Sequence, residues 1–520
     1  MLACVRTAAI LGIDAYVVLV EVDAAAGLPA ISTVGLAQSA VKEGRERVLA
    51  AIQNSGFEIP PRKVTINLAP ADIKKEGSHF DLPVACGLLV AAGLVSGLRL
   101  ERYALAGELG LDGTLRPIRG ALPMAQAICQ EGLDGFIVPS ANLAEASVQE
   151  GLEVRGAQTL AQVVEFLRRG DALAKHEFDS AGLLARRRGE SLDLADVRGQ
   201  EQAKRALEVA AAGGHNILLV GSPGGGKTML ARRLPTILPP MGLAEAIEVT
   251  RVHSVAGLLP PEQGLVTMRP FRAPHHTVSD AGLVGGGAVP RPGEASLAHH
   301  GVLFLDELTE FRRNVLESLR QPLEDGSVTI GRAARTLTYP ARFTLAAAMN
   351  PCPCGYLGDR RRRCKCTARV IRRYRSRISG PLLDRIDLHI EVPPVTYPEL
   401  VDEAETPCSM EVAARVNSAR RRQSKRFEGY ESLYANGQMG AREVKRFCMS
   451  DDTGLASLRG AMARLGLSAR SFHRILKIAR TIADLEGVEL VKSSHISEAI
   501  GYRGLDRNGP DAVGARLDTS

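Results

Sequence analysis

Eight consecutive residues form a loop that suits the binding of phosphate groups. A short apolar strand at 215–220 runs directly into this loop, and a helical pattern follows it. Glycines let backbone N–H groups turn inward around phosphate oxygens, and the N-terminus of the next helix adds a favourable dipole. In the pattern GxxxxGK[ST] the lysine reaches the β- and γ-phosphates and the hydroxyl ligates Mg²⁺, which predicts an ATP and Mg²⁺ site. Its residues are Gly221, Ser222, Pro223, Gly224, Gly225, Gly226, Lys227 and Thr228.

Polar side chains follow two further apolar strands. Asp306 and Glu307 end the run GVLFL, and Asn350 ends the run FTLAAAM. A carboxylate at a strand end can complete the Mg²⁺ shell, and its neighbour can orient and deprotonate an attacking water. We therefore predict Asp306 as a magnesium residue and Glu307 as the general base. Asn350 is expected to contact the γ-phosphate or the water; otherwise it only begins a turn before Pro351.

Two arginines are candidates for stabilising charge on a transferred phosphate. Arg385 follows the third strand, and an arginine there can cross a subunit boundary to a neighbour's γ-phosphate. Arg470 lies at the start of an amphipathic helix predicted over 465–487, which could close as a lid onto bound nucleotide. The alternative for each side chain is a surface salt bridge.

Four cysteines lie within 15 residues, directly after Asn350. Tetrahedral zinc takes four soft ligands at about 2.3 Å, and paired cysteines on two tight turns can supply them. The spacing is CxC instead of the usual CxxC, so free or redox-active thiols remain the alternative. The residues are Cys352, Cys354, Cys364 and Cys366. A second metal site at His275, His276, His299 and His300 is not expected, because adjacent histidines usually point apart.

The end of the cysteine segment and the residues that follow it carry more than the chain's whole excess of positive charge. Residues 360–377 hold ten Lys or Arg and no acidic residue, so without them the net charge of +7 would become −3. A dense basic loop beside the phosphate site could bind a nucleic-acid backbone; the alternative is a solvated surface. The predicted DNA contacts are Arg360, Arg361, Arg362, Arg363 and Lys365.

The elements that position these residues fall into three regions. Residues 1–175 mix β-rich runs with helices, buried-type strands alternate with helices over 196–395, and helical periodicity dominates 396–508. A charged linker is expected at 176–195 and a loose tail at 509–520. The pattern predicts a multidomain α/β protein whose central domain contains a parallel sheet.

Composition excludes several classes of protein. With 45% hydrophobic and 24% charged residues, the 520-residue chain can bury several cores. Nine cysteines are too few for a disulfide scaffold. The longest apolar run has 12 residues, and a membrane span needs about 20. We expect a cytoplasmic protein without a membrane partner. Because tryptophan is absent and aromatics make up 4%, nucleic-acid contacts should depend on charge more than on stacking.

Together these motifs resemble an AAA+ ATPase of the magnesium-chelatase clade. Residues 269–300 resemble the insertion in the clade's second helix, and 326–342 resemble its pre-sensor hairpin. Within the clade, the chain is similar over nearly its whole length to the ComM/YifB family, most specifically at 32–85, 271–287, 292–308 and 348–359. The resemblance implies a helical C-terminal lid domain. It also implies a ring, expected to be a hexamer, that hydrolyses ATP and acts on branched DNA in natural transformation and recombination.

The N-terminal region resembles the C-terminal domain of Lon proteases, a fold shared with ribosomal protein S5 domain 2, most clearly over 103–128. Aligned on Gly77, the nucleophile position of those proteases falls on His79, and Ser78 is one place early. The position expected to hold the lysine falls on Leu122, so Ser78 lacks that base. We therefore expect a non-proteolytic domain.

Three functions remain open from the sequence. The first is a DNA-remodelling motor, possessing helicase or branch-migration activity. The second is a magnesium-chelatase-type motor subunit that acts on a protein or metal-insertion partner. The third is a protein unfoldase or protease, against which the missing Ser/Lys pair argues. The basic cysteine segment favours the first.

Overall fold

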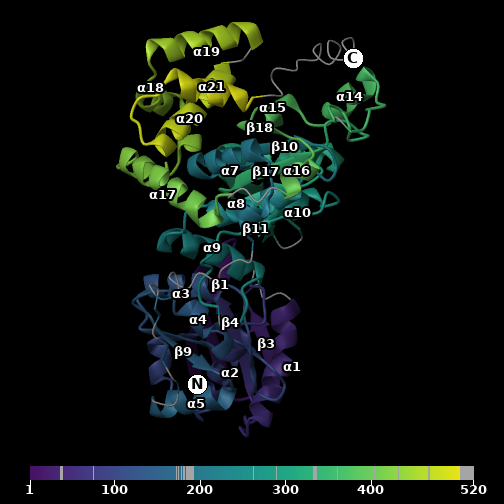
Figure 1. Cartoon of the computed structure of the whole chain (residues 1–520). Helices are drawn as coiled ribbons and strands as arrows, with labels where there is room; N and C mark the ends of the chain where they lie inside the picture. Colours follow the sequence, from purple (N-terminus) through teal and green to yellow (C-terminus); the bar gives the residue numbers. More distant parts are fainter. Residues whose placement is uncertain are drawn as a thin grey trace. The chain divides into compact units, whose positions relative to one another are not determined.

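A computed structural model of the chain confirms the mixed α/β architecture (Figure 1). The residues that it describes fall into two compact units. The first unit holds 1–187, 242–267 and 329–339, and the second holds the remaining segments. The described residues are 1–35, 39–73, 75–170, 173, 175, 176, 178, 179, 182, 192–261, 263–287, 290–331, 336–359, 361–401, 406–430, 433–465 and 469–503.

The first unit is built on one mixed sheet. Within the described residues, seven strands lie in the order β3-β4-β2-β1-β5-β8-β9, and the short strands β6 and β7 pair separately. β1 alternates its side chains between two cores: Val5 packs in the one with α2 and α5, and Ala8 packs in the other with α3. The strands are β1 (Leu2–Leu11), β2 (Asp14–Ala25), β3 (Ala30–Val34), β4 (Lys63–Ala69), β5 (Tyr103–Leu105), β6 (Glu108–Leu109), β7 (Leu115–Arg116), β8 (Gly135–Pro139) and β9 (Glu153–Ala157). The helices are α1 (Ser39–Asn54), α2 (Asp81–Ala91), α3 (Ala121–Gln130), α4 (Leu143–Ala146) and α5 (Leu160–Arg169).

Helix α9 (Leu243–Ala256) belongs to the first unit although it follows the phosphate loop in sequence. It packs on α3, and its Ser254 hydroxyl donates to the buried carboxylate of Glu145. Arg251 forms an ion pair with Asp14. No pattern in the sequence indicated that this helix packs with elements of the N-terminal region.

The second unit contains the predicted parallel sheet. Its order is β11-β14-β17-β10-β18, and neighbouring strands are parallel throughout. All five carboxyl ends therefore meet at one edge, where ligands bind in open α/β sheets. Alanines at 346, 347 and 348 in β17 are buried, and α8 packs beside this strand. The strands are β10 (Ile217–Gly221), β11 (Phe271–Arg272), β14 (Val302–Leu305), β17 (Thr344–Met349) and β18 (Leu388–Val392).

Helices of the C-terminal region share a core with this sheet. Ile475 and Ile482 of α20 pack with buried residues of α7, α17 and the strands. The helices of the unit are α7 (Glu201–Gly213), α8 (Lys227–Ile237), α10 (Asp280–Val284), α11 (Glu294–Leu297), α12 (Arg313–Ser318), α13 (Arg320–Asp325), α14 (Ala368–Arg375), α15 (Gly380–Leu383), α16 (Tyr397–Val401), α17 (Ser409–Arg426), α18 (Ala441–Phe447), α19 (Asp452–Leu465), α20 (Ala469–Glu486) and α21 (Ser493–Gly501).

Several predicted elements are confirmed. The hairpin expected over 326–342 is the two-stranded pair β15 (Ser327–Gly331) and β16 (Thr336–Pro340), and a second small pair is β12 (Gly285–Gly286) with β13 (Arg291–Pro292). Most of the expected linker and the whole expected tail lie outside the described residues. Within the described part of the chain, no helix is both long and apolar enough to span a membrane.

Candidate nucleotide-binding site

The phosphate loop connects the end of β10 to the start of α8. Gly224 and Gly226 have φ angles of 78° and 85°, which favour glycine because it lacks a Cβ. Lys227 donates from Nζ to the backbone carbonyls of Gly221, at 2.8 Å, and Ser222, at 3.0 Å. Burial lowers the pKa of this lysine. The ammonium is thus held within the turn by acceptors that phosphate oxygens can replace.

Thr228 and Asp306 meet across the sheet edge. The Thr228 hydroxyl donates to Oδ2 of Asp306 at 2.7 Å, and Oδ1 of Asp306 accepts from the backbone N–H of Glu307 at 2.9 Å. A hydroxyl and a carboxylate are oxygen donors of the kind that Mg²⁺ prefers. The donor set therefore fits the predicted magnesium ion.

The Glu307 side chain lies near His276, a contact that the sequence did not predict. Glu307 has a φ of 51°, an uncommon conformation outside glycine, and its side chain is 57% exposed. Its Oε2 lies 3.7 Å from Nδ1 of His276, in the segment after β11. The His276 ring contacts the edge of Phe311. No spacing rule could have found this pair, because the two residues lie 31 positions apart.

Asn350 joins the site from the end of β17. Its Oδ1 accepts a hydrogen bond from Nζ of Lys227 at 3.2 Å. The phosphate loop after β10 and the polar residues predicted at the ends of β14 and β17 are therefore brought to one edge of the sheet. Their catalytic roles stay predictions.

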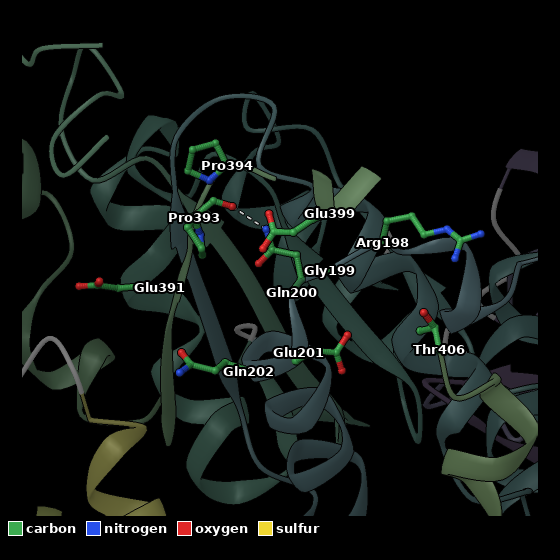
Figure 2. Close-up of a pocket in the computed structure, with 10 residues that line it drawn as sticks. All are labelled: Arg198, Gly199, Gln200, Glu201, Gln202, Glu391, Pro393, Pro394, Glu399 and Thr406. Carbon is green, nitrogen blue, oxygen red and sulfur yellow. Dashed lines mark hydrogen bonds between the residues drawn. The ribbon is translucent and has the colours of Figure 1, made fainter. Parts of the chain in front are cut away.

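A pocket beside the phosphate loop was not expected from the sequence (Figure 2). Its volume is about 440 Å³. The Gln200 amide donates to the carbonyl of Pro393 at 2.5 Å and to that of Gly225 at 3.4 Å, which connects the pocket to the phosphate loop. Gln200 has a φ of 61°. The Gly199-Gln200 turn before α7 is the sequence feature that could have indicated the pocket. The lining residues are Arg198, Gly199, Gln200, Glu201, Gln202, Glu391, Pro393, Pro394, Glu399 and Thr406.

Arg385 lies at the opposite edge of the sheet from the phosphate loop. Its backbone carbonyl accepts from the side-chain amide of Asn216, immediately before β10, whereas the phosphate loop follows the other end of that strand. The five residues of β10 span about 17 Å, which is longer than an arginine side chain. The Arg385 guanidinium forms an ion pair with Glu324 and is 11% exposed.

Arg470 lies beside Arg385 and not over the phosphate loop. Its Nη1 is 3.7 Å from Oδ2 of Asp384, the residue preceding Arg385, and its side chain is 70% exposed. Both arginines make salt bridges, but only that of Arg470 is the surface salt bridge that the sequence left as the alternative, because the Arg385 side chain is mostly buried. Their position means that neither reaches the phosphate loop of its own chain in this arrangement.

The four cysteines form one cluster. Sγ of Cys352 lies 3.4 Å from that of Cys354 and 3.7 Å from that of Cys364, and the Cys354 and Cys364 sulfurs are 3.6 Å apart. All four sulfurs, including that of Cys366, lie within 4.8 Å of one another. Tetrahedral zinc with Zn–S bonds of about 2.3 Å separates its sulfurs by about 3.8 Å. The cluster therefore fits a single zinc ion.

Comparison with known proteins identifies the family. Residues 193–400 match the family described as "Magnesium chelatase, subunit ChlI", 20–142 match "Subunit ChlI of Mg-chelatase", and 406–503 match "Magnesium chelatase, subunit ChlI C-terminal". The chain is 44% identical to the Competence protein ComM of Haemophilus influenzae over 97% of this chain and 98% of that protein. Identity and coverage are the same for the Uncharacterized protein YifB of Salmonella typhimurium. The chain belongs to the ComM/YifB family of magnesium chelatase-like AAA+ proteins.

More distant relatives match parts of this ComM/YifB chain. The Magnesium-chelatase 67 kDa subunit of Heliobacterium mobile is 29% identical over 31% of the chain and 28% of that subunit. Lon protease 2 of Bacillus subtilis is 27% identical over 25% of the chain and 23% of that protease. The predicted likeness to Lon is thus partial.

In this ComM/YifB protein the turn at Ser78, which resembles that of Lon proteases, carries a serine hydrogen-bonded to a carboxylate. The Ser78 hydroxyl donates to Glu108. His79, at the aligned nucleophile position, is buried, and burial lowers its pKa to about 4. Leu122 lies in α3 and is also buried. The absence of proteolysis stays a prediction.

The basic residues of the cysteine segment differ in their surroundings. Arg361 donates to the carbonyl of Val395 at 2.9 Å, and Arg362 donates to the Tyr356 hydroxyl at 2.8 Å. Arg361, Arg362, Arg363 and Lys365 are exposed, whereas Arg360 lies outside the described residues. The exposed side chains present positive charge to solvent, and their contact with DNA stays a prediction.

Proposed function

We propose that this ComM/YifB protein is an ATP-hydrolysing motor that assembles as a hexameric ring and remodels branched DNA, as a helicase or branch-migration enzyme. The observation that carries the proposal is the hydrogen bond between Lys227 of the phosphate loop and Asn350, which directly precedes the cysteine segment. A site for ATP and a dense basic surface thus belong to one connected structure. A relative named as a competence protein agrees with a role in transformation and recombination.

ATP hydrolysis in this site needs a base and a cation. Glu307 takes the proton of the attacking water, the water oxygen bonds to the γ-phosphorus, and the bond to the β-phosphate oxygen breaks. Lys227 binds the β- and γ-phosphates. Thr228 and Asp306 would hold Mg²⁺, which neutralises the phosphate charge. Asn350 orients the γ-phosphate or the water.

The pocket next to the phosphate loop is the proposed site of the adenine base. It adjoins Gly225 through the Gln200 side chain, so a bound base and its phosphates would occupy continuous space. The lining is rich in polar side chains, and Gln202 and Thr406 are among those that could orient a base there.

The position of the two arginines supports the proposed ring. Arg385 and Arg470 lie at the sheet edge away from the phosphate loop, so each can stabilise phosphate charge only across a subunit boundary. A head-to-tail contact of this kind gives a ring when the rotation between neighbouring subunits closes, as we propose here. The two side chains would then exchange Glu324 and Asp384 for a neighbour's ATP.

Zinc and DNA are proposed for the cysteine segment. A zinc ion on Cys352, Cys354, Cys364 and Cys366 would fix the loop that exposes Arg361, Arg362, Arg363 and Lys365. These charges would contact phosphates of the DNA backbone without reading sequence.

The proposal is tested by measuring ATP hydrolysis with and without four-way or forked DNA. We expect DNA to stimulate hydrolysis and expect Lys227→Ala, which removes the main phosphate cation, to abolish it. The magnesium-chelatase matches favour the second candidate, a motor subunit for a protein or metal-insertion partner. This second function would be supported if DNA does not change the rate of ATP hydrolysis while Lys227→Ala still abolishes it.

A further inference from the structure

The four-cysteine segment touches the phosphate loop at two points. Asn350 accepts the hydrogen bond of Lys227 at 3.2 Å. Five residues later, Gly355 packs directly on Pro223: a Cβ added to Gly355 would lie 2.6 Å from Cδ and 2.8 Å from Cγ of the proline ring. Such separations are shorter than van der Waals contact, so only glycine fits. The loop that binds phosphate and the loop that holds the thiols therefore form one packed unit.

Two of the cysteines lie between these two contact points. Cys352 and Cys354 are separated by Pro353, and the Gly355 N–H donates to the Cys352 carbonyl at 2.9 Å, which closes a tight turn. Cys352 is fully buried. A metal bound by both sulfurs and by those of Cys364 and Cys366 fixes the direction of this turn, because its four bonds replace free rotation of the segment.

We infer that the metal in the four-cysteine cluster is part of the ATP-binding machinery, and that its occupancy sets the affinity for nucleotide. The inference rests on the proposed ATP and zinc sites. With metal bound, the turn holds Asn350 at Lys227 and Gly355 against Pro223. Without metal, the segment regains conformational freedom, and ATP must order it again on binding. By linkage, ATP must strengthen metal binding by the same factor.

Two glycines in the segment provide a matched pair of variants. Gly355 and Gly358 both have a φ of 83°, but nothing lies within 4 Å of a Cβ at Gly358. Alanine adds the same backbone strain at both positions, and only Gly355→Ala displaces Pro223. We expect Gly355→Ala to weaken binding of a fluorescent ATP analogue by about tenfold, in the range of coupled sites. The affinity of Gly358→Ala for the analogue should stay within about twofold of the wild-type value. Both variants should keep the zinc content of the wild-type protein. Equal effects of the two substitutions on nucleotide affinity would overturn the inference.

The second measurement removes the metal from the full-length wild-type protein. Chelation should weaken binding of the ATP analogue, and added zinc should restore it. The reciprocal readout is zinc affinity, measured by competition with a chromophoric chelator, which a non-hydrolysable ATP analogue should raise by the same factor. Stripped protein that binds nucleotide as tightly as the zinc-loaded protein would contradict the inference while leaving the ATP site intact. Wild-type protein without zinc would overturn the metal site, and wild-type protein that binds no ATP analogue would overturn the proposed function.

Discussion

Nδ1 of His276 lies 3.7 Å from Oε2 of Glu307, so a histidine from the segment after β11 faces the predicted general base at the end of β14. The Glu307 backbone is in the left-handed region, and its side chain is mostly exposed. Even a fully charged pair at the surface contributes only about 0–1 kcal/mol to stability. The contact therefore matters for where the carboxylate points more than for folding.

Replacing His276 with alanine should lower kcat for ATP hydrolysis by about tenfold or more, because a base displaced by about 1 Å loses catalytic efficiency. The KM for ATP should change little, since His276 does not belong to the phosphate loop. His275→Ala is the control: His275 bonds Thr277 at 2.9 Å and its ring lies against His276. If both alanine variants lower kcat equally, His276 has no specific role at Glu307.

Glu307→Gln should retain ATP binding and stop hydrolysis, because an amide cannot accept the proton of the attacking water. Removal of a general base typically costs about 10²- to 10⁴-fold in rate. Equilibrium binding of an ATP analogue and single-turnover hydrolysis measure the two properties separately. Wild-type turnover by this variant would show that another group is the base.

Arg385→Ala should lose hydrolysis while each subunit still binds ATP, since the proposed contact is to a neighbour. An arginine finger contributes about 10³- to 10⁵-fold to kcat. Mixing Arg385→Ala subunits with Glu307→Gln subunits should restore activity. In random one-to-one rings, about a quarter of the interfaces then combine an intact Glu307 with an intact Arg385. Mixtures as inactive as the separate variants would indicate that Arg385 is a structural partner of Glu324.

Replacing Arg360, Arg361, Arg362 and Arg363 with alanine should weaken DNA binding and reduce its salt dependence. Each lost phosphate contact lowers the log–log slope by about 0.9 on duplex DNA, so four contacts lower it by at most about 3.6. The change in slope should be smaller if, in the wild-type protein bound to DNA, Arg361 and Arg362 keep their hydrogen bonds to Val395 and Tyr356. Arg169→Ala, in α5 of the other unit, is the exposed control. A slope unchanged in the four-arginine variant would make this segment a solvated surface.

The sequence determined the nucleotide site because its parts are local. Gly221 to Thr228 join a strand to a helix through a loop whose conformation depends on neighbouring residues. β10 ends at the first residue of this loop, and β14 and β17 each end one residue before the predicted polar side chain. Parallel strands place their carboxyl ends at one edge, so Asp306 and Asn350 had to meet the loop. The four cysteines were equally visible, since they lie within 15 residues.

The tertiary structure decided what depends on contacts between distant segments. It placed Arg470 beside Asp384 and not over the phosphate loop, brought His276 to Glu307, and built the pocket at Gln200 from segments almost 200 residues apart. It also packed α9 with the N-terminal sheet and set Gly355 against Pro223. Local propensity and periodicity describe which face of an element is buried, but the partner of that face is chosen by packing across the whole chain.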